Sequence, residues 1–297
     1  MRKTVLLLAS MALAVLLASG VAFAATFRGT DGNDYIRGTD NADTILGLDG
    51  EDVLDGRGGG DVIKGGRGSD RGTGGPGNDT IYLGPGNDGA DEPPPPPCPP
   101  TCFGIGPGLD YVFQGGLGKD VIYSGEGNDE IEGDIGAQPG SPREPATGDD
   151  ILYGEAGSDF LSGEGGSDIL YGGEGSDILF DYEVCRTAAD VLYGGDGDDT
   201  LYSFLDYGIC PVLQKGDVFY GGEGDDEIIT SIHDPRHAIE ADIIYGGPGN
   251  DYIDSSTEAE EAGKTGKDRV YCGKGIDRVK ADSDDRIASD CEKVIRD

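Results

Sequence analysis

Aspartates recur at nine-residue spacing along most of this chain, usually at the end of a glycine-rich turn sequence. The stretch from Gly172 to Tyr202 shows the unit, because it contains GGEGSDILF, a short interruption ending in AADVLY, and GGDGDDTLY. Glycines at positions 1, 2 and 4 allow a tight turn whose backbone carbonyls point into a shared space. The aspartate at position 6 adds an anionic oxygen. Carbonyl and carboxylate oxygens are the ligands that calcium prefers, so the unit indicates calcium binding.

The three residues after each aspartate must position these turns. They are enough for a minimal strand in which position 8 points inward and positions 7 and 9 point outward. Position 8 is Ile, Val or Leu in most units. A strand this short cannot bury its apolar side chain alone, so successive units must stack on one another. The pattern therefore predicts an all-β solenoid rather than a disordered Gly/Asp-rich linker, which has no reason to keep an aliphatic residue at position 8.

The unit resembles the RTX (hemolysin-type) calcium-binding nonapeptide repeat, and the resemblance extends from Gly29 to Ile287. It implies a right-handed parallel β-roll, a β-solenoid in which two consecutive units form one coil. It also implies that each calcium ion lies between successive turns at the same edge. With two units per coil, alternate turns lie on opposite edges.

Seven units run without a gap from Gly29 to Asp91, and their turns serve both edges. Two of them are weak at position 8, where Gly72 and Ala90 stand, so we expect a looser structure there. The predicted metal ligands in these units are Asp34, Asp43, Asp52, Asp61, Asp70, Asp79 and Asp88.

Later units are interrupted by insertions that precede alternate turns, namely those ending in Asp150, Asp190, Asp217, Asp242 and Asp268. The resemblance therefore implies that these insertions share one edge, while the other edge keeps intact glycine turns and an unbroken column of calcium ions. We expect fewer ions at the interrupted edge, since most of its glycines are missing. The predicted ligands in this part of the chain are Asp110, Asp120, Asp129, Asp150, Asp159, Asp168, Asp177, Asp199, Asp226, Asp251 and Asp277.

Tyrosine ends many of the strands that follow the interrupted turns, in the triplets VIY, ILY, ILY, VLY, VFY, IIY and RVY. In a parallel sheet these rings would stack about 4.8 Å apart as an outward ladder. Two interpretations remain open: the rings are covered by one another and by the insertions, or they form a contact surface for polysaccharide, a cell surface or a second copy. The ladder would contain Tyr123, Tyr153, Tyr171, Tyr193, Tyr220, Tyr245 and Tyr271, and the candidate contact residues are Tyr153, Tyr171, Tyr193, Tyr220 and Tyr245.

The charge balance excludes one class of partner. The chain has 22 Lys and Arg against 58 Asp and Glu, a net charge of −36 at pH 7, so we expect no binding of nucleic acid. Self-repulsion should keep the metal-free chain expanded, and calcium binding should therefore be coupled to folding.

The beginning of the chain has the pattern of a secretory signal peptide. Arg2 and Lys3 precede an apolar run from Val5 to Val21, and the sequence Ala22-Phe23-Ala24 fits the small-x-small cleavage rule. We expect cleavage after Ala24, an extracellular location, and no membrane span in the mature chain.

Six cysteines in an exported chain favour disulfides, although the sequence alone leaves all pairings open. Two cysteines lie in successive insertions, where neighbouring coils are about 5 Å apart, close to the Cα separation of a disulfide. Two others lie in the last regular turn and in the tail, and the remaining two flank part of a proline-rich stretch. The expected pairs are Cys185–Cys210, Cys272–Cys291 and Cys98–Cys102.

No arrangement of catalytic residues is visible in the sequence. The two histidines, His233 and His237, flank Pro235, which argues against the helix that a zinc site would need there. Two histidines offer few candidates for the general base of a nucleophile–base triad. We expect no enzymatic activity, although RTX repeats often accompany a protease, lipase or polysaccharide lyase.

These observations divide the chain into a signal peptide (1–24), N-terminal repeats (25–91), a proline-rich loop (92–104), repeats with insertions at one edge (105–280) and a C-terminal cap (281–297). We expect a structural and calcium-binding module whose folding depends on extracellular calcium. The alternative is an adhesin or matrix component that binds polysaccharide or itself through the tyrosine-rich sheet face.

Overall fold

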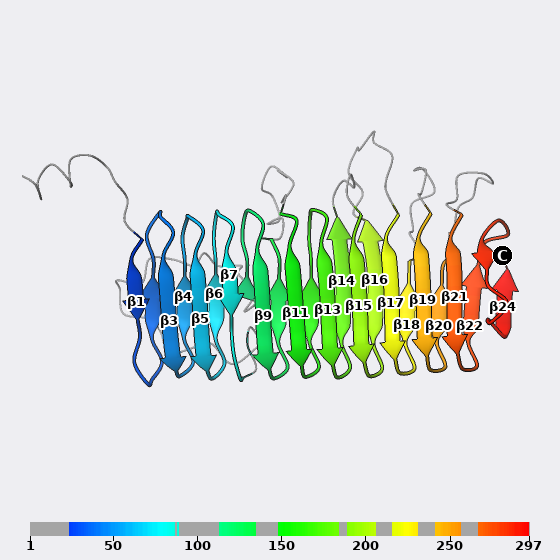
Figure 1. The fold of residues 1–297 in the computed structure, drawn as a ribbon, viewed down its shortest axis with the longest axis horizontal. Helices are drawn as coiled ribbons and strands as arrows, with labels where there is room; N and C mark the ends of the chain where they lie inside the picture. The colour runs from blue at the N-terminus through cyan, green and yellow to red at the C-terminus, as the bar shows by residue number, and fades with distance from the viewer. Residues whose placement is uncertain are drawn as a thin grey trace, which may run out of the picture.

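The computed structural model describes residues 24–86, 88, 113–134, 148–183, 189–205, 216–230, 241–256 and 267–296. These residues form two parallel sheets of 12 strands each and contain no helix. Odd-numbered strands make up sheet A and even-numbered strands make up sheet B, so the chain changes sheet after every strand. The coils follow one another from β1 at one end of an elongated stack to β24 at the other (Figure 1). The predicted β-roll is confirmed.

Most strands of sheet A have six residues, because they continue into the first residues of the next turn, whereas most strands of sheet B have three. Sheet A consists of β1 (Thr26–Arg28), β3 (Thr44–Asp49), β5 (Val62–Arg67), β7 (Thr80–Tyr82), β9 (Val121–Glu126), β11 (Ile151–Ala156), β13 (Ile169–Glu174), β15 (Val191–Asp196), β17 (Val218–Glu223), β19 (Ile243–Pro248), β21 (Arg269–Lys274) and β23 (Arg286–Ile287). Sheet B consists of β2 (Tyr35–Arg37), β4 (Val53–Asp55), β6 (Arg71–Thr73), β8 (Phe113–Gln114), β10 (Glu130–Glu132), β12 (Phe160–Ser162), β14 (Ile178–Glu183), β16 (Thr200–Leu205), β18 (Glu227–Ile229), β20 (Tyr252–Asp254), β22 (Arg278–Ala281) and β24 (Lys293–Arg296).

Each strand pairs with the strand one coil later at identical repeat positions. Ile169–Tyr171, for example, pairs with Val191–Tyr193. The same register continues to Val218–Tyr220, although a longer interruption separates those two strands in the sequence. The insertions therefore lengthen the connections without shifting the ladder.

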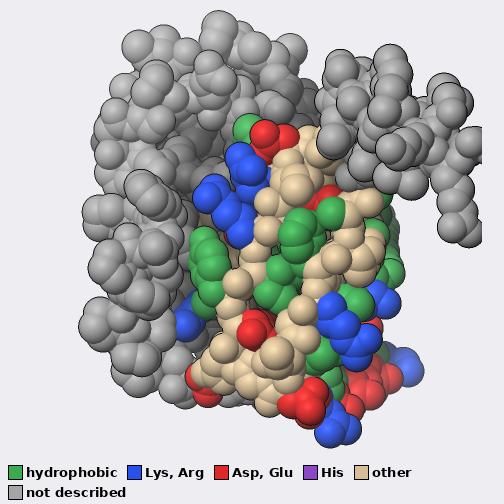
Figure 2. Space-filling view, turned by 90° about the vertical axis from the view of Figure 1, so that its left-hand side faces the viewer, with side chains coloured by type: hydrophobic (Ala, Val, Ile, Leu, Met, Phe, Trp, Pro, Cys, Tyr) green, Lys and Arg blue, Asp and Glu red, His purple; other side chains and the backbone are tan. Residues whose placement is uncertain are grey.

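Position 8 of each unit supplies the core between the sheets, as predicted. Leu152, Leu170 and Leu192 of sheet A are fully buried, and so are Leu161 and Leu201 of sheet B. At the N-terminal end of the stack, hydrophobic side chains lie toward the middle and charged side chains toward the rim (Figure 2). A thin aliphatic column thus runs along the whole solenoid.

One core position differs from the sequence prediction. We expected Ala90 to occupy position 8 after the Asp88 turn, but Phe113 fills it, since it pairs with Ile131 of the next coil and is fully buried. In the register of sheet B, a phenylalanine of β8 therefore stands where the spacing predicts an alanine. Strand pairing therefore places Phe113, rather than Ala90, in the core at this position.

Two kinds of turn define the two edges of the solenoid. Turns that lead from sheet A to sheet B form what we call the glycine edge, and turns that lead from sheet B to sheet A form the insert edge. The segment between Asp88 and β8 follows a turn of the glycine edge. The segments 135–147, 184–188, 206–215, 231–240 and 257–266 all connect a strand of sheet B to a strand of sheet A, so these insertions share one edge, as predicted.

The tail completes the stack with one shorter coil. Strand β23 pairs with β21 in sheet A, and β24 pairs with β22 in sheet B. A disulfide joins Cys272 to Cys291 with a Cα–Cα distance of 5.2 Å and confirms that predicted pair. The other four cysteines, Cys98, Cys102, Cys185 and Cys210, lie outside the described residues. The described part of the chain contains no helix that could span a lipid bilayer.

Candidate metal sites at the solenoid edges

The position-6 aspartates form two columns, one along each edge. In each column the backbone N–H of one aspartate donates a hydrogen bond to Oδ1 of the aspartate one coil later. The amide of Asp177 thus bonds Asp199 at 2.9 Å on the glycine edge, and the amide of Asp150 bonds Asp168 at 2.8 Å on the insert edge. The glycine edge contains Asp34, Asp52, Asp70, Asp88, Asp129, Asp159, Asp177, Asp199, Asp226, Asp251 and Asp277. The insert edge contains Asp43, Asp61, Asp79, Asp120, Asp150, Asp168, Asp190, Asp217, Asp242, Asp268 and Asp285.

This bonding scheme uses only one oxygen of most of these carboxylates. The second oxygen, Oδ2, is buried and has no hydrogen-bond partner in 16 of the position-6 aspartates. Buried polar atoms are normally satisfied, so a repeated orphan oxygen calls for a ligand. The 16 aspartates are Asp52, Asp61, Asp70, Asp79, Asp88, Asp120, Asp129, Asp150, Asp159, Asp168, Asp177, Asp190, Asp199, Asp226, Asp251 and Asp277.

The glycine at position 1 leaves room for these oxygens. A Cβ atom on Gly154 would lie 2.5 Å from the carbonyl oxygen of Gly172 and 2.6 Å from Oδ2 of Asp159, closer than real Cβ atoms come to any atom. A carboxylate from the glycine's own turn and a backbone carbonyl from the next coil thus both approach this glycine. All of these donors are hard oxygens, and no nitrogen or sulfur ligand accompanies them at this turn. The donor set fits calcium.

The glycines at positions 2 and 4 shape the turn. Gly195 and Gly197 have φ values of +126° and +134°, which side chains with a Cβ rarely adopt. Non-glycine residues also take positive φ at position 2, as Glu155 does at 69°, so glycine favours a turn that brings successive carbonyls to the edge but is not present in every such turn. On the insert edge, where most of these glycines are replaced, the aspartate column nevertheless continues.

Burial raises the pKa of most of these aspartates. The pKa of Asp159 and of Asp199 is raised to about 7, first by burial and then by the neighbouring aspartates of the column, against the effect of the backbone hydrogen bond. Burial, followed by the charges of Asp129 and Asp70, raises the pKa of Asp88 to about 9. Burial and the neighbouring carboxylates therefore oppose full ionisation of the columns at neutral pH, and cations among the carboxylates would favour the ionised form.

The structure places every described aspartate of the predicted ligand set in one of the two columns, whereas Asp110 lies outside the described residues. It also adds aspartates that sequence reasoning left out, because their turns lack the glycines. Their signal is the position directly before a strand triplet, as in DVLY, DVFY, DIIY and DRVY. These additional column members are Asp190, Asp217, Asp242 and Asp268, and the tail adds Asp285.

The last turn of the glycine edge is completed in a different way. The amide of Asp277 donates to Oε2 of Glu292 at 3.0 Å, so a glutamate of the tail replaces the next aspartate of the column.

Comparison with known protein families agrees with this geometry. A family model of the RTX calcium-binding nonapeptide repeat, four copies long, matches residues 28–63, 64–89, 112–137, 146–179, 187–203, 215–231 and 240–257, more than half of the 297 residues. The chain belongs to the RTX calcium-binding repeat family. RTX nonapeptide repeats bind Ca²⁺, and the buried aspartate columns of this RTX chain have the donors that such binding needs. No curated protein matches the chain.

A second feature of this RTX chain is a ladder of stacked tyrosines on sheet A. Neighbouring ring centroids are 4.7 to 5.0 Å apart and the ring planes differ by 2° to 11°. The spacing equals the separation of paired strands, because each ring stands at the same repeat position. The ladder contains one ring more than predicted and consists of Tyr82, Tyr123, Tyr153, Tyr171, Tyr193, Tyr220, Tyr245 and Tyr271.

Proposed function

We propose that this chain is a secreted structural module whose folding is coupled to extracellular calcium. The supporting observation is the column of buried carboxylate oxygens without hydrogen-bond partners at both edges. Ionised at neutral pH, these groups repel one another and oppose formation of the coils. Calcium between them removes that repulsion, so ion binding and folding become one event. The signal-peptide pattern at the start of the sequence supports secretion.

We assign the ions to the turns of both edges, with carboxylate ligands from the position-6 aspartates and carbonyl ligands from the glycines. The glycine edge carries the continuous column of ions, because its turns keep the sequence that presents carbonyls. The proposed carboxylate ligands are Asp34, Asp43, Asp52, Asp61, Asp70, Asp79, Asp88, Asp120, Asp129, Asp150, Asp159, Asp168, Asp177, Asp199, Asp226, Asp251 and Asp277.

Circular dichroism during a calcium titration tests the coupling. Chain stripped of metal by a chelating resin should show little β-structure at pH 7.5, and the β-signal should appear with a midpoint on the order of 10⁻⁴ to 10⁻³ M, the range of extracellular calcium modules. A titration with magnesium is the control, since magnesium requires stricter octahedral geometry and gives up its water reluctantly. A spectrum that stays the same after complete removal of calcium would contradict the proposal.

The tyrosine ladder favours a second candidate function, an adhesin or matrix component. Stacking turns the ring faces toward one another, so the ladder presents a row of ring edges and phenol groups, and its two end rings, Tyr82 and Tyr271, are 42% and 40% exposed. Phenol groups combine an apolar ring with a polar hydroxyl, which suits the mixed apolar and polar surface of a sugar, so we propose polysaccharide as the ligand. Replacing both Tyr193 and Tyr220 by Ser should abolish retention on a polysaccharide column in calcium. Unchanged retention of the double variant on the polysaccharide column would contradict this second proposal. A double variant that loses self-association in ultracentrifugation instead would contradict it as well.

A further inference from the structure

One carboxylate of the insert edge does not belong to either aspartate column. Asp181 follows the triplet Ile178–Phe180 and therefore takes position 1 of its turn, which is glycine in the regular unit. In the register of sheet B it pairs with Ser203, which occupies the same position one coil later. At the corresponding place in the previous coil, a Cβ on Gly163 would meet Oδ2 of Asp168. A side chain at position 1 therefore points toward the aspartate column.

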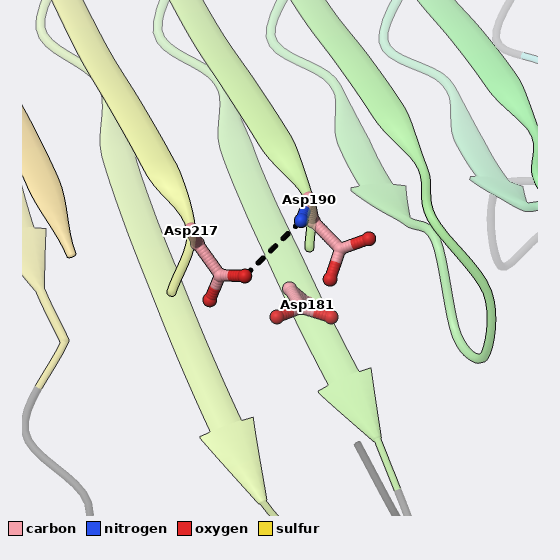
Figure 3. Close-up of side chains that lie close together, drawn as sticks. All are labelled: Asp181, Asp190 and Asp217. Atoms are coloured by element: carbon pink, nitrogen blue, oxygen red, sulfur yellow. Dashed lines mark hydrogen bonds between the residues drawn. The ribbon is translucent and has the colours of Figure 1, made fainter. Parts of the chain in front are cut away.

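Asp181 meets two members of that column. One carboxylate oxygen from each of Asp181, Asp190 and Asp217 lies within 4.8 Å of the others, and all three residues are buried. These are the residues that form such a group within the described ranges. They come from β14 and from the turns before β15 and β17, and their carboxylates lie close together (Figure 3).

An unsatisfied oxygen points into this group. Asp190 is fully buried, and its Oδ1 accepts the amide of Asp168 at 2.7 Å. Its Oδ2 has no hydrogen-bond partner. Figure 3 shows the carboxylate of Asp190 directed toward that of Asp181, while the amide of Asp190 donates to Oδ1 of Asp217 at 3.1 Å. The orphan oxygen is therefore aimed at a space that other carboxylates also face.

The hydroxyl of Ser203 supplies a fourth oxygen. Its Oγ lies 3.4 Å from Oδ2 of Asp181 and 3.3 Å from Oδ2 of Asp217. The hydroxyl therefore lies within hydrogen-bonding distance of both carboxylates, and a hydroxyl oxygen is itself a hard ligand that a cation can bind. The four side chains thus surround one polar space that is enclosed by protein.

We propose that Asp181, Asp190, Asp217 and Ser203 bind an additional divalent cation through side-chain oxygens alone. The ion is calcium, because every donor is a hard oxygen and the arrangement is irregular, which calcium tolerates. The site differs from the repeat sites in that a carboxylate at position 1 takes the place of the glycine. It restores an ion at a point where the glycine turn sequence is interrupted by DYEVCRTAA. The proposal goes beyond the function proposed for the repeat turns, because Asp190 and Asp217 belong to the insert-edge column but are not among the ligands assigned to those turns.

Diffraction from crystals grown in calcium, with data collected at a wavelength where calcium scatters anomalously, tests this site directly. The expected result is a peak about 2.3–2.6 Å from the oxygens of Asp181, Asp190 and Asp217, in addition to peaks at the repeat turns. Peaks at the turns without one at this cluster would overturn the inference and leave the proposed function intact. A peak at the cluster alone would support the inference and contradict the assignment of ions to the turns.

A matched pair of variants tests the same point in solution. Asp181→Asn keeps the shape of the side chain but removes its charge, and it should lower the calcium bound per chain by one ion in equilibrium dialysis. Asp196→Asn removes the same charge from an exposed turn position on the glycine edge and should bind as many ions as the unsubstituted chain. Asp181→Gly restores the regular unit, so it provides a folded comparison if the Asn variant does not fold. An unchanged ion count in a folded Asp181 variant would overturn the inference.

Discussion

The backbone amide of Asp177 donates a hydrogen bond to Oδ1 of Asp199, one coil later, at 2.9 Å. The Oδ2 atom of Asp199 has no partner and lies beside Gly194. One carboxylate therefore does two things: it satisfies the backbone of the previous coil and presents an oxygen to the edge of the solenoid.

Substitution of Asp199 separates these two contributions. Asp199→Asn keeps an acceptor for the Asp177 amide and loses the charge, whereas Asp199→Ala loses both. We expect both variants to need more calcium to fold. The free energy of unfolding should fall by about 1–3 kcal/mol more in the Ala variant than in the Asn variant, because Ala leaves a buried amide unsatisfied. Urea unfolding in saturating calcium measures the difference. Equal losses in the two variants would show that the hydrogen bond to the amide contributes nothing.

Gly195→Ala tests the backbone geometry of the turn. Gly195 has a φ of +126°, and a Cβ there would collide with the carbonyl of Gly173. We expect backbone strain to lower the free energy of unfolding by about 1–3 kcal/mol, together with weaker calcium binding at this turn. Gly32→Ala is the control, because a Cβ on Gly32 meets nothing within 4 Å. The midpoints of urea unfolding should differ between the two variants; if they coincide, the turn does not require glycine.

The core ladder makes a prediction that is independent of metal ligands. Leu192 is fully buried, so Leu192→Ala should cost about 2–5 kcal/mol in the calcium-bound protein. Ile178, at position 7 of its unit, is 41% exposed, and Ile178→Ala should cost much less. Denaturant unfolding of both variants at the same calcium concentration checks this. Comparable losses would mean that the inward direction of position 8 is assigned wrongly.

Acidity should partly replace calcium. The pKa of Asp159 and of Asp199 is raised to about 7 by burial, whereas an aspartate in an unfolded chain titrates near 3.9. Between about pH 4 and pH 7 the metal-free fold therefore binds more protons than the unfolded chain does, so its stability falls as the pH rises through this interval. Below about pH 4 both states are protonated and this stabilisation is fully present.

Circular dichroism of resin-stripped protein from pH 4 to pH 8 measures this effect. We expect more β-structure at pH 4.5 than at pH 7.5 in the absence of metal, and little dependence on pH in saturating calcium. Metal-free protein that gains β-structure as the pH rises would contradict the assignment of raised pKa values.

The sequence predicts most of the fold because two short periods determine it. The nine-residue spacing places the turns, and the alternation within a triplet directs Leu170 inward and Tyr171 outward. The pairing partner after an interruption could not be predicted in the same way. Phe113 rather than Ala90 completes its coil, because the register depends on which downstream residues pair with Ile131, and spacing carries no information across an insertion.

The candidate sites were predictable where the glycines are present and less so elsewhere. Asp190 and Asp217 stand in the column although their turns do not match the unit, since the strand that follows fixes their place. Asp181 could not be recognised from the sequence. Its importance comes from the position-1 geometry, which brings it to Asp190, in the turn that follows β14, and to Asp217 one coil further on.

The hydrogen bond from Asp277 to Glu292 shows that the solenoid has a direction. Each aspartate amide in the columns donates to a carboxylate that lies further along the chain. The hydrogen bonds of one coil are therefore completed only by the next, C-terminal coil. Removal of N-terminal coils would expose carboxylate oxygens, which water solvates well. Removal of the tail would take away both the acceptor of the Asp277 amide and the Cys272–Cys291 disulfide. Deletion of coils should therefore be better tolerated at the N-terminal end of the solenoid than at its C-terminal end.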